Sequence, residues 1–144
     1  MDIRLNKENE IDSLVNIWYE GSLFAHDFID ENFWKSHCTK MKEEYLPNSE
    51  TYVVTDKGEI VGFISMVESY LAALFIDHNH QSKGYGKELL NFIKEQRDTI
   101  QLKVYKKNDK AINFYLKNGF VEVEELQDEK TGEREILMEW ERSP

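Results

Sequence analysis

Two glycines and two lysines follow an apolar run and precede a helical pattern, a combination suited to anion binding. The run Leu71–Ile76 has the length of one buried strand. Gly84 and Gly86 then lie where a helix begins, so a bulky anion could approach main-chain N–H groups that have no helical partner. Lys83 and Lys87 add positive charge at the same place. We infer a phosphate-bearing ligand of the nucleotide-cofactor type.

The glycine spacing excludes two common phosphate-binding motifs. A P-loop needs Ser or Thr after Gly-Lys, whereas Glu88 follows Gly86-Lys87 here. A dinucleotide fingerprint needs a third glycine at a different spacing. What remains is Gln81-x-x-Gly84-x-Gly86. An ordinary strand–turn–helix connection and a nucleotide-phosphate binder stay open as alternatives at this point.

Composition and charge narrow the class of protein. The 144 residues, 40% hydrophobic and 12% aromatic, suit a single folded domain over residues 1–144. A net charge of −10 disfavours nucleic acid and suits a cationic substrate such as an amine, although ordinary solubility also explains it. No run is long enough to span a membrane, and residues 1–6 carry no apolar signal region. A single cysteine, Cys38, permits no internal disulfide and suits a reducing cytoplasm.

The elements that position this stretch follow from hydrophobic periodicity and turn residues. We expect Gly21 to end or kink the first helix and Asp30 to cap the second. The expected order is β-α-α-β-β-β-α-β-α-β-β, an α/β (α+β) mixed sheet of about seven strands flanked by four helices, parallel at its centre and antiparallel at its edges. The strands are expected at residues 2–5, 51–55, 60–67, 70–76, 100–105, 120–126 and 135–140, and the helices at 7–19, 30–45, directly after the glycine loop, and at 108–117.

A second motif joins the glycine loop and completes a resemblance. Asn108-Asp109-Lys110-Ala111-Ile112-Asn113-Phe114-Tyr115, followed by Asn118-Gly119-Phe120, resembles the N-x-x-A-x-x-F-Y…G-F signature of the GNAT superfamily of N-acetyltransferases. The Gln81–Gly86 loop resembles their acyl-CoA pyrophosphate loop, and the element order is that of their fold. The stretch His26–Trp34 is similar to a small single-domain bacterial subgroup of proposed lysine acetyltransferases.

The resemblance implies acetyl-CoA as cofactor and a place for it. The strand before the glycine loop would splay from its parallel neighbour, so that its free main chain could pair with the pantetheine arm and polarise the thioester carbonyl. The diphosphate would lie on the N–H groups of residues 82–87. The residues expected at the cofactor are Leu74, Phe75, Ile76, Gln81, Ser82, Lys83, Gly84, Tyr85, Gly86, Lys87, Asn108, Lys110, Ala111 and Tyr115.

The resemblance also implies direct acetyl transfer to an amine in a ternary complex. Tyr115 is the candidate general acid for the leaving thiolate. Several related enzymes carry a glutamate base on the strand before the asparagine, where this sequence has Lys103. We predict Glu68 as the replacement base, with a chain of ordered waters equally open and His26 and Tyr105 as weaker candidates.

The sequence also bears on metal binding, on the role of Cys38, on the acceptor and on a non-catalytic alternative. The pair His78-x-His80 has no cysteine or carboxylate cluster to complete a metal site, so we expect no metal. We expect Cys38 to be a small buried apolar residue and not a nucleophile. The acceptor is a small-molecule, peptide or protein amine, with lysine preferred, and the chain is a monomer or homodimer. A non-catalytic acyl-CoA-binding sensor is the alternative of a different class. The aromatic residues that could wall the acceptor pocket are Trp18, Phe24, Phe28, Phe33 and Trp34.

Overall fold

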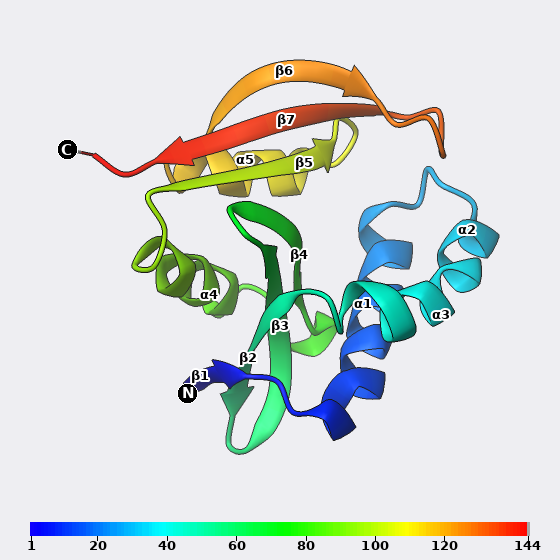
Figure 1. Ribbon diagram of the computed structural model, residues 1–144. Coiled ribbons are helices and arrows are strands. Elements are labelled where there is room, and N and C mark those ends of the chain that lie inside the picture. The colour runs from blue at the N-terminus through cyan, green and yellow to red at the C-terminus, as the bar shows by residue number, and fades with distance from the viewer. Residues whose placement is uncertain (144) are drawn as a thin grey trace.

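A seven-stranded mixed sheet in the order β1-β2-β3-β4-β5-β7-β6 forms the centre of the protein (Figure 1). The computed structural model describes residues 1–143. The predicted architecture of about seven strands and four helices is confirmed. Within the described residues no helix has the length and apolar character that a membrane span requires. The elements are β1 (Asp2–Leu5), η1 (Glu8–Glu10), α1 (Ile11–Ala25), α2 (Glu31–Ser36), α3 (Cys38–Lys40), η2 (Met41–Tyr45), β2 (Glu50–Asp56), β3 (Glu59–Val67), β4 (Tyr70–Ile76), η3 (His78–His80), α4 (Tyr85–Lys94), β5 (Thr99–Tyr105), α5 (Asp109–Lys117), β6 (Val121–Gln127) and β7 (Arg134–Glu141).

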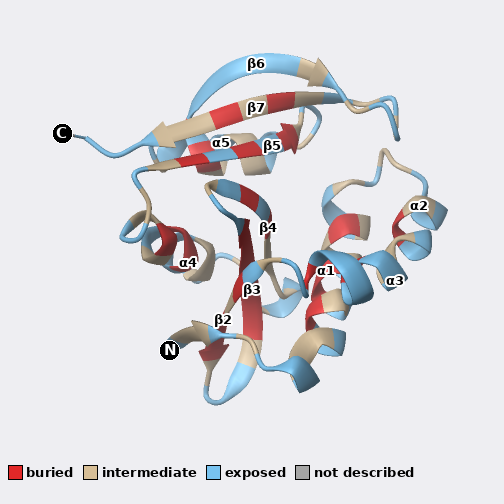
Figure 2. Cartoon of the chain, viewed as in Figure 1, coloured by how far each residue is buried: buried red, intermediate tan, exposed pale blue. Residues whose placement is uncertain are grey.

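The sheet is covered on both faces, and each face has its own apolar core. On one face α1 and the segment from α2 to η2 pack on β2, β3 and β4 through residues such as Leu14, Trp34 and Phe63. On the other face α4 and α5 pack through residues such as Leu89 and Tyr115. Figure 2 shows buried residues concentrated in the strands and on the sheet-facing sides of these helices.

Gly21 was expected to end or kink the first helix, and it does not end it. Helix α1 continues through Gly21 to Ala25. A Cβ on Gly21 would lie 2.7 Å from Phe75 Cδ1, so the missing side chain lets α1 pack closely on β4. Glycine serves packing at this position, which local sequence does not reveal because Phe75 is distant along the chain.

The prediction of one continuous helix over residues 30–45 is also wrong, although Asp30 caps its start as expected. Asp30 Oδ1 accepts a 2.7 Å hydrogen bond from the N–H of Asn32. The helix ends at Ser36, whose hydroxyl donates to the carbonyl of Phe33. The N–H of His37 consequently turns to the carbonyl of Trp34, three residues back, and the chain continues as α3 and the π-helical η2.

Candidate active site

Strands β4 and β5 separate soon after they meet, as the resemblance predicts. Their parallel pairing consists of Tyr70 with Gln101, at the start of β4. The β3–β4 register shifts between Ser65 and Met66 and leaves Ala72 without a partner, which makes Ala72 a bulge. A bulge bends its strand and increases the local twist, so it turns the rest of β4 away from β5. The main chain of β4 beyond Ala72 therefore faces an opening instead of a neighbouring strand.

A cleft of about 960 Å³, here called the donor cleft, occupies this opening. Its walls come from α1, β4, the glycine loop, β5 and the beginning of α5. Every residue expected at the cofactor lines it except Lys83, which is exposed. Folding thus brings together two motifs that lie on either side of β5 in the sequence.

The floor of the glycine loop presents free N–H groups. Ser82 and Gly84 have positive φ angles of 66° and 86°, and a Cβ on Gly84 would meet nothing within 4 Å. The hydrogen-bond ladder of α4 begins with the N–H of Glu88, which donates to the carbonyl of Gly84 at 3.0 Å. The amides of residues 85–87 therefore have no helical partner and, with the helix dipole, form an anion site. The left-handed conformation of Ser82 was not foreseen, because serine is not a residue that favours it.

Gln81 connects the two sides of the opening. Its Nε2 donates to the carbonyl of Ile76 at 3.3 Å, and its Oε1 accepts from Lys110 Nζ at 3.0 Å. Asn108 caps α5, since its Oδ1 accepts from the N–H of Ala111 at 3.3 Å. These contacts hold the end of β4 and the start of α5 at a fixed separation around the cleft.

His26 is placed as a support for Asn108 and not as a base. Its Nε2 lies 3.3 Å from Asn108 Nδ2, which can only donate. The ring proton therefore sits on Nδ1, which is buried without a hydrogen-bond partner. Burial lowers the pKa of His26 to about 4, so the ring is neutral near pH 7 and has no free lone pair for proton abstraction.

Tyr115 lines the donor cleft and is 8% exposed. Its ring packs edge-on against Phe114 and Phe120, with centroids 5.3 and 5.4 Å away. Its hydroxyl makes no hydrogen bond to another described residue. Burial, and then the nearby Tyr70, raise the pKa of Tyr115 well above its ordinary value. The phenol is therefore protonated across the neutral range and can donate its proton in the cleft.

The structure does not bring Glu68 to the cleft. Glu68 is exposed in the β3–β4 turn with a φ of 56°, and its carbonyl accepts from Arg97 Nε at 3.1 Å. It lines neither of the two cavities described here. Tyr105 does line the donor cleft, but burial raises its pKa and its hydroxyl donates to Asp128 Oδ2 at 3.1 Å. Neither position favours the base roles considered from the sequence.

Sequence reasoning missed Glu135, a carboxylate on the wall of the donor cleft. Glu135 is half-buried on β7 and pairs directly with Tyr105 across the β5–β7 ladder. Burial and the charge of Asp128 raise its pKa, with Lys103 acting in the opposite direction. The strand containing Glu135 was predicted, but its place between β5 and β6 was not. No local signal in the sequence marks the residue.

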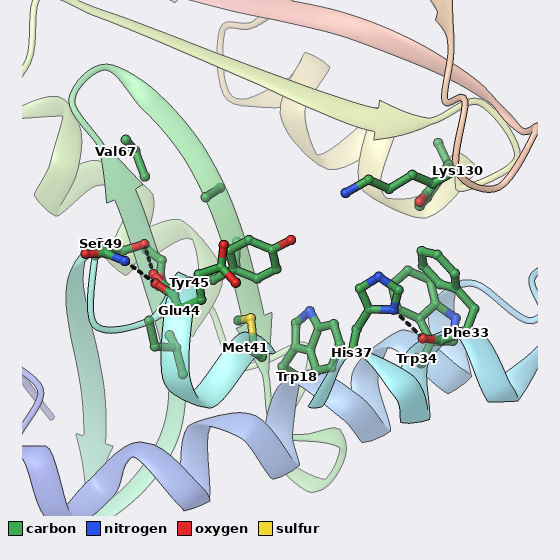
Figure 3. A pocket seen from close by; sticks show the side chains of 16 residues that line it. Trp18, Phe33, Trp34, His37, Met41, Glu44, Tyr45, Ser49, Val67 and Lys130 are labelled. Atoms are coloured by element: carbon green, nitrogen blue, oxygen red, sulfur yellow. Dashed lines mark hydrogen bonds between the residues drawn. The ribbon is translucent and has the colours of Figure 1, made fainter. Parts of the chain in front are cut away.

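A second cavity of about 500 Å³, here called the side pocket, adjoins the donor cleft. Trp18, Trp34, Ala72, Ala73 and Tyr105 line both cavities, so the two share a wall. Figure 3 shows other residues of this pocket. They come from the α2–η2 segment, from Ser49, from Val67 at the end of β3, and from Lys130, which extends from the β6–β7 turn toward Tyr45.

Among the other aromatic candidates, Phe33 lines the side pocket and Phe24 lines the donor cleft. Phe28 lines neither cavity but packs against Tyr105 at 5.7 Å between ring centroids.

The remaining candidate residues have structural contacts of their own. His80 Nδ1 lies 2.8 Å from Asp77 Oδ2, and the ring of His78 lies 4.7 Å from that of Phe24. The Cys38 thiol donates to the carbonyl of Trp34, and burial raises its pKa, so it stays protonated near pH 7. A protonated thiol is a poor nucleophile.

Comparison with known proteins agrees with this geometry. The family model described as acetyltransferase (GNAT) domain matches residues 8–142. The chain belongs to the GNAT acetyltransferase family. It is 31% identical over 139 residues to an Escherichia coli K12 protein named peptidyl-lysine N-acetyltransferase YiaC, covering 96% of this chain and 95% of that protein.

Two solved structures share the fold. The solution structure of apo-form YjaB from Escherichia coli superposes with a TM-score of 0.85 at 24% identity, covering 96% of each chain. The PaiA N-acetyltransferase of Thermoplasma acidophilum in complex with coenzyme A superposes with a TM-score of 0.80 at 21% identity, covering 99% of this chain and 100% of that one.

This GNAT protein is therefore an N-acetyltransferase whose donor substrate is acetyl-CoA. Its cleft fits that donor in three respects. The unpaired main chain of β4 can bind the pantetheine amides, the residue 85–87 amides can bind the diphosphate, and the open space at Gly84 admits the phosphate oxygens. The enzyme class and the cofactor expected from the sequence are confirmed.

Proposed function

We propose that this enzyme acetylates the ε-amine of lysine residues in proteins or peptides. The observation that carries the proposal is the 31% identity with YiaC, which extends over 96% of the chain. The side pocket supports it, because a long and slender lysine side chain suits an entrance that shares its wall with the donor cleft. Glu44 on the pocket wall can attract an ammonium group, whereas Lys130 at the rim opposes one.

We assign the chemical roles to residues that line the donor cleft. The backbone of Leu74–Ile76 binds the pantetheine arm and places a main-chain N–H at the thioester oxygen, where negative charge develops. The amine attacks the carbonyl carbon directly, the carbon–sulfur bond breaks, and Tyr115 donates its proton to the departing sulfur. Gln81, Asn108, Lys110 and Ala111 keep the opening in shape and contact the donor.

Three acceptors test the lysine assignment, and the release of free thiol from acetyl-CoA measures the turnover of each. The first is a peptide with a blocked N-terminus and one lysine, the second a lysine-free peptide with a free N-terminus, and the third a small polyamine. We expect turnover with the first and acetylation of its lysine by mass spectrometry. Preferred turnover of the lysine-free peptide or of the polyamine would contradict the lysine assignment and leave the acetyltransferase activity intact.

The cellular setting is part of the same proposal. We place the enzyme in the cytoplasm, where a chain with Cys38 as its single cysteine needs no disulfide, as one domain acting as a monomer or homodimer. An acidic chain with a net charge of −10 is not expected to use nucleic acid as a partner.

A further inference from the structure

Glu135 is the half-buried carboxylate of the donor cleft. Asp109 also lines the cleft, but it is exposed at the start of α5. On β5, Leu102 and Val104 face the core beneath α4 and α5, so Lys103 and Tyr105 point to the opposite face. Glu135 is paired with Tyr105 and shares that face, which is the face of the side pocket.

Tyr70 connects Glu135 electrostatically to the proposed acid. The charge of Glu135 contributes to a raised pKa of Tyr70, after the larger effect of burial. Tyr70 in turn contributes to the raised pKa of Tyr115. All three side chains line the donor cleft. Tyr70 itself lies at the pairing of β4 with β5, where the two strands begin to part.

The surroundings raise the pKa of this carboxylate, which makes it a stronger base than an ordinary glutamate. Lys103 stabilises its charged form, whereas burial and Asp128 destabilise it. Lys103 on β5 thus occupies the position where the resemblance implies a glutamate base. The carboxylate of Glu135 lies on the neighbouring strand β7. The charged or titratable groups near Glu135 are Lys103 and Tyr105 on β5, Tyr70 on β4, Asp128 in the β6–β7 turn, Glu124 on the same face of β6, and Glu133, which pairs with Lys107.

We propose that Glu135 is the general base that accepts a proton from the acceptor ammonium, directly or through one water. The neutral amine then attacks the thioester carbonyl carbon, and the carbon–sulfur bond breaks. Tyr115 protonates the sulfur and regains a proton from the nitrogen of the new amide, while Glu135 releases its proton to solvent. This inference rests on direct transfer to an amine and holds for any primary amine that the enzyme accepts.

Glu135→Gln tests the proposal, with Glu139→Gln as its matched control. Glu139 lies on the same face of β7, four residues along, and donor-cleft residues do not include it. We expect Glu135→Gln to lower kcat by about 100-fold or more, the lower end of the range for general acid–base catalysis. We also expect it to remove the acidic limb of the kcat–pH profile, which the wild type and Glu139→Gln retain at a pH above the ordinary glutamate pKa of 4.5.

Two further readouts exclude a structural explanation. Thermal unfolding and coenzyme A affinity of Glu135→Gln should match the wild type, and Glu135→Asp should restore part of kcat and the acidic limb. An unchanged profile in Glu135→Gln, or a lower kcat that keeps the acidic limb, would overturn the base assignment.

The assay uses both a lysine peptide and a small primary amine, so that the acceptor and the base are tested separately. A wild-type enzyme that turns over the small amine and rejects the peptide contradicts the lysine proposal. In that case the Glu135→Gln comparison is made on the small amine, and its outcome still decides the base.

Discussion

Removing the Tyr115 hydroxyl is the sharpest perturbation of the proposed chemistry. Tyr115→Phe keeps the ring that packs on Phe114 and Phe120 and removes a hydroxyl that makes no hydrogen bond to another described residue. The fold therefore loses no internal hydrogen bond. We expect the free energy of unfolding to change by less than about 1 kcal/mol, since removal of a bonded hydroxyl is what usually costs more.

Catalysis should respond far more strongly. General acid catalysis contributes about 10²- to 10⁴-fold, which corresponds to about 3–5 kcal/mol of transition-state stabilisation. Because the hydroxyl acts on the leaving sulfur, kcat should fall by that factor while KM for acetyl-CoA stays within about twofold. The raised pKa of Tyr115 also predicts no loss of wild-type activity through its ionisation at pH 7 to 9.

Free-thiol release at saturating acetyl-CoA measures kcat, and isothermal titration with coenzyme A measures affinity. Tyr52→Phe is a suitable control, because Tyr52 packs on Phe92 outside the cleft and donates to Glu50 at 2.6 Å. A Tyr115→Phe enzyme as fast as the wild type would refute the assignment of Tyr115 as the acid. A loss of coenzyme A affinity in that variant would indicate a binding role instead.

Three other variants address the frame around the cleft. Gly62→Ala places a Cβ 2.8 Å from the carbonyl oxygen of Phe75. We therefore expect the free energy of unfolding in urea to fall by about 1–3 kcal/mol and coenzyme A to bind more weakly. Wild-type values for both would contradict the tight packing of β3 on β4. The Arg4 guanidinium lowers the pKa of Glu10 to about 2, so the stabilisation from this ion pair is present above pH 4.5 and is lost as pH falls toward 2. Arg4→Met should therefore lower Tm at pH 7 but not at pH 2. Equal losses at both pH values would exclude the ion pair as the cause. Glu68→Gln should keep the wild-type pH profile, because Glu68 lies outside both cavities, and a lost acidic limb would restore it as a base.

The order of elements and most of the donor cleft could be predicted because they rest on local signals. Apolar alternation, turn residues and two short motifs placed each strand and the start of α4 within a few residues. Asn108 caps α5 as the motif implies. The helix over residues 30–45 failed for a local reason, because the side chain of Ser36 competes for the Phe33 carbonyl.

The identity of a base could not be predicted because it depends on pairing between distant segments. Strand β7 inserts between β5 and β6, which puts Glu135 beside Tyr105, about 30 residues away in sequence. Glu68 looked suitable because it follows the end of β3, yet it lies in the β3–β4 turn and does not line the cleft. Strand order and the direction of a turn are properties of the whole sheet.

Amide hydrogen exchange with and without coenzyme A measures the separation of β4 from β5 most directly. The free enzyme should exchange amides on the β5-facing side of residues 72–76, and those of residues 85–87, at fast rates, because these groups have no strand or helix partner. Coenzyme A should slow both sets together. Protection of the β5-facing amides of residues 72–76 already present in the free enzyme, or exchange that coenzyme A leaves unchanged at both places, would contradict the open pair of strands as the donor site.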